Sequence, residues 1–428
     1  MKLYYWAIGS LLVLGACGSD GEEDDNNVEP TVQDTNLDDD AGDDDVGDDD
    51  NNGDDDESAT PEPETTLPSC NFVTGDEGGV TIAKDRGEYL IVNTSLLKDQ
   101  AYTWDIDILS DETTVYEVYE VLEGNDAGSY LFRSFDSGCE FEEIESLGGK
   151  SFRGLEVDPS DEDRMYLWSP NSATILSTTN AWRTSATITP GAPGIVAMAV
   201  DPAEGARLSA VGSDAKLYTS TDGGATWKST DIGIPEGATV ENAAFSPSDP
   251  NVIIVGTDTV AWYRSVDGGQ SWEAANTGLY SEGEEPGSPE LVSLNISFST
   301  ADPNLVYGVL NRTTGGGEIY RSTDLAQTWT RVDDIAVPKE SSDTTPLAVS
   351  LSTRVYADPV SPDIFYTWYG SYYTDLNVIF YVCEVNNNQI EYTPYEYAFQ
   401  SIYSMAFHPL DPTTFYLGRL NYGDKQPH

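Results

Sequence analysis

Histidine and basic side chains are scarce in this sequence. Its 428 residues include two histidines, His408 and His428, and 20 Lys and Arg against 75 Asp and Glu. A histidine-rich zinc site or a Ser-His-Asp triad has almost no material to work with. The net charge of -55 argues against nucleic acid and anionic headgroups as partners, because binding them needs clustered Lys and Arg. We therefore predict no metal and no cofactor.

The apolar run at the N-terminus is too short to cross a bilayer. Lys2 precedes an uncharged stretch, residues 3–16, where a spanning helix needs about 20 residues. This layout predicts an export signal. The stretch ends in Leu-Gly-Ala before Cys17, which resembles a bacterial lipobox. The resemblance implies a signal peptide over residues 1–16, an acylated Cys17 and a lipid-anchored protein of the cell envelope, with Gly18 favouring the outer membrane.

The next segment has almost no apolar residues. Residues 18–66 hold 22 Asp and Glu and no Lys or Arg. Such a chain repels itself and cannot bury enough surface to fold, so residues 17–69 are predicted to be a lipidated cysteine followed by a disordered acidic linker. Loose calcium binding by this polyanion is possible, whereas a specific EF-hand is not expected, because Ala59 stands where the loop needs its bidentate Glu.

Only three cysteines follow Cys17. Outside the cytoplasm one disulfide is expected among Cys70, Cys139 and Cys383, and one thiol is left over. The spacing does not indicate which pair forms.

Residues 70–428 lack any long segment of helical periodicity and consist of short β-rich runs separated by Gly, Pro, Asp and Asn. A strand, a Pro/Asp turn and a second strand recur, as in LEVDPSDEDRMYLW from Leu155 and MAFHPLDPTTFYLG from Met405. The equivalent turns lie 43 to 61 residues apart, a period typical of four-stranded blades. They fall at Asp111, Asp161, Glu204, Asp249, Asp302, Asp363 and Asp411.

A second motif, S-x-D-x-G-x-[ST]-W, accompanies this repeat. It is complete in STDGGATW from Ser220 and SVDGGQSW from Ser265, and altered in STDLAQTW from Ser322 and SFDSGCEF from Ser134. Near Trp182 it is too eroded to identify. It resembles the Asp-box, or BNR repeat, of sialidase-like propellers, sortilin-type receptors, xyloglucanases and photosystem II assembly factors. The resemblance implies a structural turn opposite the ligand site, formed here by Asp136, Ser220, Asp222, Gly224, Trp227, Ser265, Asp267, Gly269, Trp272, Ser322, Asp324 and Trp329.

The fold expected from these repeats is a single all-β propeller of seven blades. The last repeat has room for only two strands, and residues 80–94 supply the missing two. N-terminal strands would then complete the C-terminal blade, close the ring and remove its edges.

Ligands of propellers usually bind at the mouth, where the innermost strands begin. The two positions before each such strand are Thr103 and Trp104, Arg153 and Gly154, Val196 and Ala197, Glu241 and Asn242, Leu294 and Asn295, Thr353 and Arg354, and Tyr403 and Ser404. Two arginines there could hold an anion by forked hydrogen bonds, or could instead neutralise Glu241 and its neighbours. Two long loops on the same face, residues 276–293 and 337–352, and the nearby Tyr372 and Tyr373 add aromatic and polar contacts. The predicted ligand-binding residues are Arg153, Glu241, Asn242, Asn295, Arg312, Arg354, Tyr372, Tyr373 and Tyr403.

Two functions of different class remain open. The sequence lacks the Arg-Ile-Pro signature of sialidases and builds one propeller where the xyloglucanases use two. These departures favour a non-catalytic binding or assembly module for a glycan or protein ligand. The alternative is a glycoside hydrolase acting on an extracellular polysaccharide, for which Glu241 is the one acid we nominate.

Overall fold

The structure is a computed structural model that describes residues 67–74, 79–92, 101–147, 151–281, 284, 290–312, 316–340, 345–349, 353–370, 378–398 and 401–421. The predicted signal peptide, Cys17 and nearly all of the acidic linker lie outside these residues. Within them the chain forms 29 strands and one short 3-10 helix, Asp85–Gly87. None of the helices described is long and apolar enough to cross a membrane.

The strands form antiparallel sets of four, which we number in chain order as blades 1 to 7. Blade 1 consists of β3 (Ala101–Ile108), β4 (Val115–Val121), β5 (Gly128–Ser134) and β6 (Glu142–Ser146). Blade 2 consists of β7 (Gly154–Val157), β8 (Arg164–Trp168), β9 (Ile175–Thr179) and β10 (Ala186–Ile188). Blade 3 consists of β11 (Ile195–Val200), β12 (Leu208–Gly212), β13 (Lys216–Ser220) and β14 (Lys228–Asp231).

The remaining blades follow the same order from inner to outer strand. Blade 4 consists of β15 (Val240–Phe245), β16 (Ile253–Thr257), β17 (Trp262–Ser265) and β18 (Glu273–Ala274). Blade 5 consists of β19 (Leu291–Phe298), β20 (Val306–Arg312), β21 (Gly316–Ser322) and β22 (Thr330–Arg331). Blade 6 consists of β24 (Val355–Ala357), β25 (Ile364–Gly370), β26 (Val378–Asn386) and β27 (Gln389–Tyr397), with β23 (Ala336–Pro338) added parallel to β27.

Blade 7 joins the two ends of the described chain. It consists of β28 (Ser401–Phe407), β29 (Phe415–Asn421), β1 (Val80–Lys84) and β2 (Tyr89–Val92). β1 pairs with β29 in the register Ile82 to Tyr416, so N-terminal strands complete the last blade as expected. Because β29 also pairs with β3 through Leu420 and Tyr102, blades 7 and 1 share one eight-stranded sheet, while each of the other five sets is a separate sheet.

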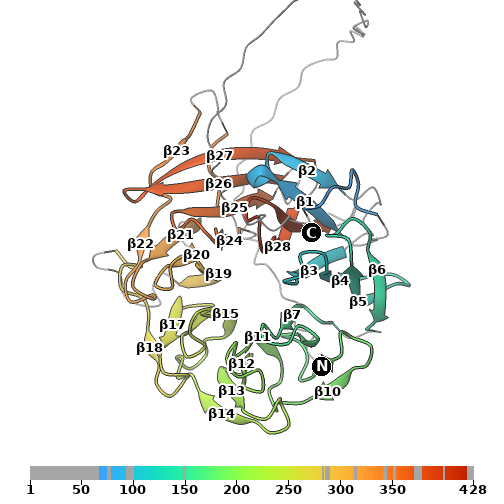
Figure 1. Cartoon of the computed structure of the whole chain (residues 1–428). Coiled ribbons are helices and arrows are strands. Elements are labelled where there is room, and N and C mark those ends of the chain that lie inside the picture. The colour runs from blue at the N-terminus through green and yellow to red at the C-terminus, as the bar shows by residue number, and fades with distance from the viewer. Residues whose placement is uncertain are drawn as a thin grey trace, which may run out of the picture. The chain divides into compact units, whose positions relative to one another are not determined.

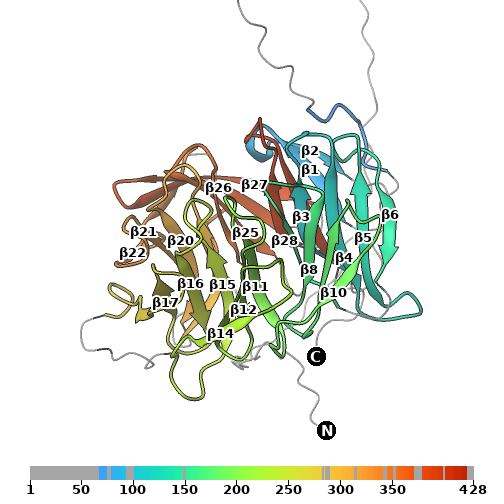
Figure 2. The same ribbon diagram turned by 60° about the horizontal axis from the view of Figure 1, so that its bottom comes forward.

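The sheets surround a common axis. Figure 1 shows β3, β7, β11, β15, β19, β24 and β28 nearest to it, and Figure 2 shows β3 to β6 running side by side. In the part of the chain that is described, a buried apolar cluster lies between each blade and the next. For example, the rings of Tyr307 and Phe365, from blades 5 and 6, lie 4.9 Å apart. The expectation of an all-β propeller is confirmed.

The Asp-boxes form the stapled turns that the motif predicts. In blade 4, Ser265 donates to Asp267, the Gly269 N–H donates to Ser265 Oγ at 2.9 Å, and the Ser271 N–H donates to Asp267 at 2.9 Å. The same contacts recur at Asp136, Asp222 and Asp324. The structure also reveals the eroded box of blade 2, in which Asn180 replaces Asp and Trp182 takes the glycine position with a φ of 62°.

The box tryptophans are not equally buried. Trp329 is 4% exposed, and its ring lies 4.1 Å from that of Trp262 in blade 4. Trp227 and Trp272 are only partly buried. Trp329 therefore belongs to the core between blades 4 and 5, whereas Trp227 and Trp272 pack only at the edges of the next clusters.

The structure identifies the cysteine pair that the sequence spacing leaves open. Cys70 and Cys139 are bonded, with Cα atoms 5.6 Å apart, and Cys383 is a buried free thiol in β26. Cys139 belongs to the box turn of blade 1, so the disulfide fastens the N-terminal segment to that turn. Burial raises the pKa of the Cys383 thiol well above its usual range.

Candidate functional site: the mouth of the propeller

The inner strands carry β-bulges at the positions that the repeats place at the mouth. Register shifts occur in β3, β11, β15, β19 and β28. A bulge adds an unpaired residue and redirects its side chain, which is how a strand presents a group at a site. The extra residues are Trp104, Val196, Glu241, Leu294 and Tyr403. The two arginines lie just before β7 and β24, which have no such shift.

Four of these side chains form a continuous row, which we call the mouth ladder: Arg153, Trp104, Tyr403 and Arg354. The Arg153 guanidinium lies 4.1 Å from the centre of the Trp104 ring. Trp104 meets Tyr403 edge to face with ring centres 4.5 Å apart, and the Arg354 guanidinium lies 5.5 Å from the Tyr403 ring. Tyr102 stacks on Trp104 at 5.1 Å. The ladder therefore crosses blades 2, 1, 7 and 6 with a cation at each end.

The two cations differ in their surroundings. The buried Glu120 accepts a hydrogen bond from Trp104 Nε1 at 2.6 Å and lies 3.7 Å from Arg153 Nε. Arg354 donates to the Thr353 carbonyl at 3.1 Å and makes no ion pair within the described residues. Cation–π contacts hold both guanidinium planes in place.

Acidic side chains line the inner strands below the ladder. Burial raises the pKa of Asp105 to about 7 and that of Glu156 to about 8. Burial, followed by the charges of Asp105 and Glu156, raises the pKa of Asp107 well above its usual range. Carboxyl groups enclosed together disfavour their charged forms, so this cluster holds protons near neutral pH. In the described part of the chain, no group of three or more His, Cys, Asp or Glu is arranged to hold a metal ion.

Several polar residues of the inner strands link neighbouring blades. Asp105 accepts from the Leu155 N–H at 2.9 Å, and Glu156 accepts from the Val200 N–H at 3.0 Å. The predicted ligand residues Asn242 and Asn295 act in the same way. Asn242 exchanges two hydrogen bonds with Ser293 at 3.0 Å. Asn295 accepts from the Val355 N–H at 2.8 Å. Their amide groups therefore hold blades 4, 5 and 6 together.

Glu241 is separate from the two arginines. Thr239 donates to Glu241 at 3.1 Å, and burial, together with the charge of Asp258, raises the pKa of the Glu241 carboxyl. Arg153 instead pairs with Glu120. Of the alternative that the arginines neutralise Glu241 and its neighbours, the described residues show only the contact of Arg153 with the acid Glu120, and they show no ion pair between either arginine and Glu241.

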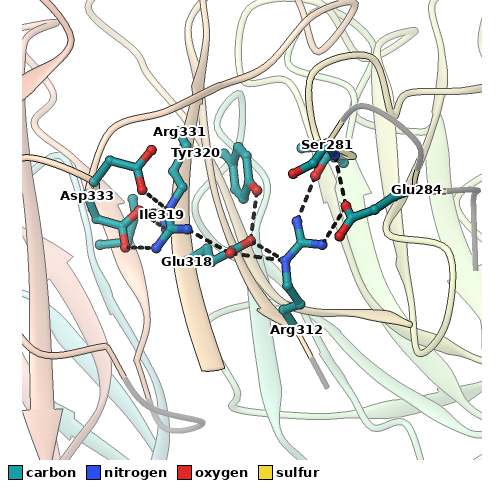
Figure 3. Close-up of polar contacts among 10 residues, drawn as sticks. Ser281, Glu284, Arg312, Glu318, Ile319, Tyr320, Arg331 and Asp333 are labelled. Atoms are coloured by element: carbon teal, nitrogen blue, oxygen red, sulfur yellow. Dashed lines mark hydrogen bonds and ion pairs between the residues drawn. The ribbon is translucent and has the colours of Figure 1, made fainter. Parts of the chain in front are cut away.

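Arg312 lies in an ion-pair network of blade 5 (Figure 3). Its Nε donates to Glu318 at 3.1 Å, one terminal nitrogen donates to Glu284 at 3.0 Å and the other to the Leu279 carbonyl at 2.8 Å. Glu318 also accepts from Arg331 at 2.8 Å. Arg312 is 11% exposed and its charge is matched by two carboxylates, so it fastens the loop that follows blade 4.

Sequence reasoning missed part of the site. The predicted ligand-binding residues do not include Trp104, although it holds a mouth position, and they do not include Tyr102 or Glu120. The signal for Trp104 was its place in the repeat, equivalent to Arg153 and Tyr403. Tyr372 and Tyr373, by contrast, lie outside the described residues.

The ring of four-stranded blades, the stapled turns and the bulged mouth define a BNR-type β-propeller. The family model "Photosynthesis system II assembly factor YCF48" matches residues 177–354. A curated relative, the "Dispase autolysis-inducing protein" of Streptomyces mobaraensis, is 31% identical over 360 residues, which cover 82% of this chain and 88% of that protein. The chain belongs to the same family as the dispase autolysis-inducing protein.

Solved structures share the fold at low identity. The structure of YCF48 bound to a D1 peptide has a TM-score of 0.51 at 16% identity, covering 82% of this chain and 97% of that one. YCF48 of Cyanidioschyzon merolae has a TM-score of 0.51 at 12% identity, with coverages of 79% and 98%. The GH74 xyloglucanase of Xanthomonas campestris has a TM-score of 0.52 at 16% identity. The alignment covers 81% of this chain but only 54% of the xyloglucanase.

Proposed function

We propose that the propeller is a non-catalytic binding module whose mouth ladder holds a protein partner. The observation that carries this proposal is Arg354, a cation stacked on Tyr403 at 5.5 Å with no carboxylate partner among the described residues. Trp, Tyr and Arg are the side chains that dominate protein interfaces, since each combines an apolar face with a polar edge. The ladder presents one Trp, one Tyr and two Arg in one row.

Two of the similar proteins support a protein ligand over a glycan. By its name, the Streptomyces mobaraensis relative induces autolysis of dispase, so its object is another protein. The YCF48 structure contains a D1 peptide. A peptide segment that carries a carboxylate would suit a mouth with a cation at each end of the ladder.

The test is capture of envelope proteins on the immobilised propeller. Wild type is compared with Arg354→Ala and with Glu236→Ala, a control at an exposed residue. A partner bound by wild type and by the control, but at least tenfold less by Arg354→Ala, supports the proposal. Equal capture by all three proteins places the partner elsewhere.

Anchoring at the membrane is part of the same proposal. The lipobox at Cys17 and the acidic linker suit a lipoprotein of the cell envelope whose binding module stands off the bilayer, in the outer membrane by the Gly18 criterion. Cys17→Ala should release the protein from membranes. If the variant still sediments with membranes after a high-salt wash, the anchor is not at Cys17.

Glycoside hydrolysis is the second candidate, because Glu241 has a raised pKa and lies near a second carboxyl, Asp258. Such a pair is the minimum that a glycosidase requires. Incubation of the protein with xyloglucan distinguishes the two functions. The binding proposal predicts no release of sugar, whereas release that disappears in Glu241→Gln would establish the hydrolase.

A further inference from the structure

Two Asp-boxes hold an extended segment of this chain through a threonine. In blade 1, the Thr74 N–H donates to the Cys139 carbonyl at 2.6 Å, and the Phe141 N–H donates to the Thr74 carbonyl at 2.9 Å. In blade 5, the Trp329 N–H donates to the Thr277 carbonyl at 2.9 Å. Both contacts are isolated parallel bridges, and each joins the threonine to the fourth residue after the box Asp.

The two segments share a sequence as well as a position. Thr74 is followed by Gly75, and Thr277 by Gly278. Gly278 has a φ of +93°, and a Cβ added there would collide with the carbonyl oxygen of Trp329. Glycine therefore permits the close approach of the segment to the box. Each segment runs between the box and the outer part of the blade before it, so one mode of contact occurs twice in the molecule.

Beside the blade 3 box, the described residues supply no equivalent segment. No segment of the described residues makes a parallel bridge to Thr226, the fourth residue after Asp222. A groove of about 400 Å³ lies there between β10, flanked by Ser177 and Thr189, and the box turn Gly223–Ala225. A second groove of about 250 Å³ shares Ser177 and Gly223 with it.

The length of the connection between neighbouring blades explains why no segment of the described chain fills this groove. The connection from β18 to β19, which supplies Thr277, spans residues 275–290. The connection from β10 to β11 spans only residues 189–194. It leads directly to the next inner strand and has no residues to spare for a segment beside the box.

The chemistry of the groove suits an uncharged extended chain. β10 carries Ala186, Thr187 and Ile188, of which the first two are exposed, and it pairs with β9 alone in the described sheets. An exposed strand edge without charges offers free backbone groups to a further strand. The nearby charges are already matched, because Arg164 pairs with Asp158 at 2.8 Å.

We propose that the groove between β10 and the blade 3 box binds an extended Thr-Gly segment of a partner protein, in the parallel mode that Thr74 and Thr277 adopt within the chain. The partner's threonine would bridge the backbone of Ala225 and Trp227, which correspond to Cys139 and Phe141 of blade 1. This site lies on the Asp-box face, and it does not depend on the mouth ladder.

The test uses the full chain and two fluorescent peptides that copy its own segments, NFVTGD (residues 71–76) and ANTGLY (residues 275–280). Saturable binding is expected by fluorescence anisotropy. Thr187→Trp, which fills the groove from an exposed position, should weaken binding at least tenfold, while Ala203→Trp, on an exposed turn outside the groove, should not. Thermal unfolding of both variants checks that they remain folded.

A third peptide tests the mode of contact. In NFVPGD, proline replaces the threonine and removes the N–H that Thr74 donates to Cys139, so binding should be lost. The proposal is overturned if neither threonine peptide binds, if Thr187→Trp binds as wild type does, or if the proline peptide binds equally well.

Discussion

Gly269 and Ala326 occupy the same position in two Asp-boxes, although alanine has a Cβ atom and glycine has none. Their φ angles are 80° and 62°, in the left-handed region that favours glycine. A Cβ at Gly269 would also collide with Leu217, so Gly269→Ala should lower the free energy of unfolding by about 2–4 kcal/mol through backbone strain and overpacking. Ala326→Gly should be neutral or stabilise by up to about 1 kcal/mol. Urea unfolding measures both, and a similar loss in the two variants would contradict this account.

The Asp-box carboxylates should make the free energy of unfolding depend on pH in the acidic range. Hydrogen bonds from the Ser271 hydroxyl and N–H lower the pKa of Asp267 to about 2, below its ordinary value of 3.8. A lowered pKa in the folded state means that this contribution is present above about pH 4 and is lost as the pH falls toward 2. Asp267→Asn should show a shallower decline in the free energy of unfolding across this window than wild type. Glu236→Gln, at an exposed residue outside the boxes, is the control, and parallel curves for all three proteins would exclude the effect.

Truncation to alanine of two arginines on the mouth face should change the free energy of unfolding by very different amounts. Arg312 is 11% exposed and lies between two carboxylates, so Arg312→Ala leaves the buried Glu318 with fewer partners and should cost about 3–5 kcal/mol. Arg354 has no ion pair among the described residues, and Arg354→Ala should change stability by less than about 0.5 kcal/mol. Chemical unfolding of both variants makes the comparison. Equal losses would mean that Arg354 is structural.

At the scale of elements, the N-terminal segment depends on its disulfide. Val73 is fully buried against blades 1 and 7, Thr74 bridges the box of blade 1, and Cys70 is bonded to Cys139. Cys70→Ser with Cys139→Ser should lower the free energy of unfolding by about 2–5 kcal/mol, because the crosslink restricts the unfolded chain. Thermal unfolding with and without reductant provides the measurement. An unchanged midpoint would show that backbone contacts alone hold the segment.

The structural elements that repeat from blade to blade could be predicted from the sequence, whereas those that occur once could be predicted less well. The blade pattern, the closure by β1 and β2 and the stapled boxes follow from repeated local chemistry. The box at Asn180 could not be found, because neither its Asn nor its Trp182 matches the motif. The contacts that Asn242, Asn295 and Arg312 make within the fold could not be predicted for another reason. Their partners Ser293, Val355 and Glu284 come from other blades or loops, and such pairings depend on tertiary structure.

For the whole molecule, the propeller has two faces with different chemistry. The mouth face carries the ladder of two cations and two aromatic rings, together with Asp105, Asp107 and Glu156, carboxyl groups whose pKa values burial raises. The Asp-box face carries the stapled turns and the groove beside β10. We propose one partner at the mouth and an extended segment in the groove beside β10. Of these two, the mouth is central to the proposed function.

Site-specific photo-crosslinking in the native host tests that claim most directly. A photoreactive phenylalanine analogue replaces Tyr403 in the mouth ladder in one variant, and Val360, exposed on the Asp-box face of blade 6, in another. The account predicts a discrete crosslinked protein from position 403 that disappears when Arg354→Ala is added, and none from position 360. Crosslinks from position 360 with none from position 403 would contradict it.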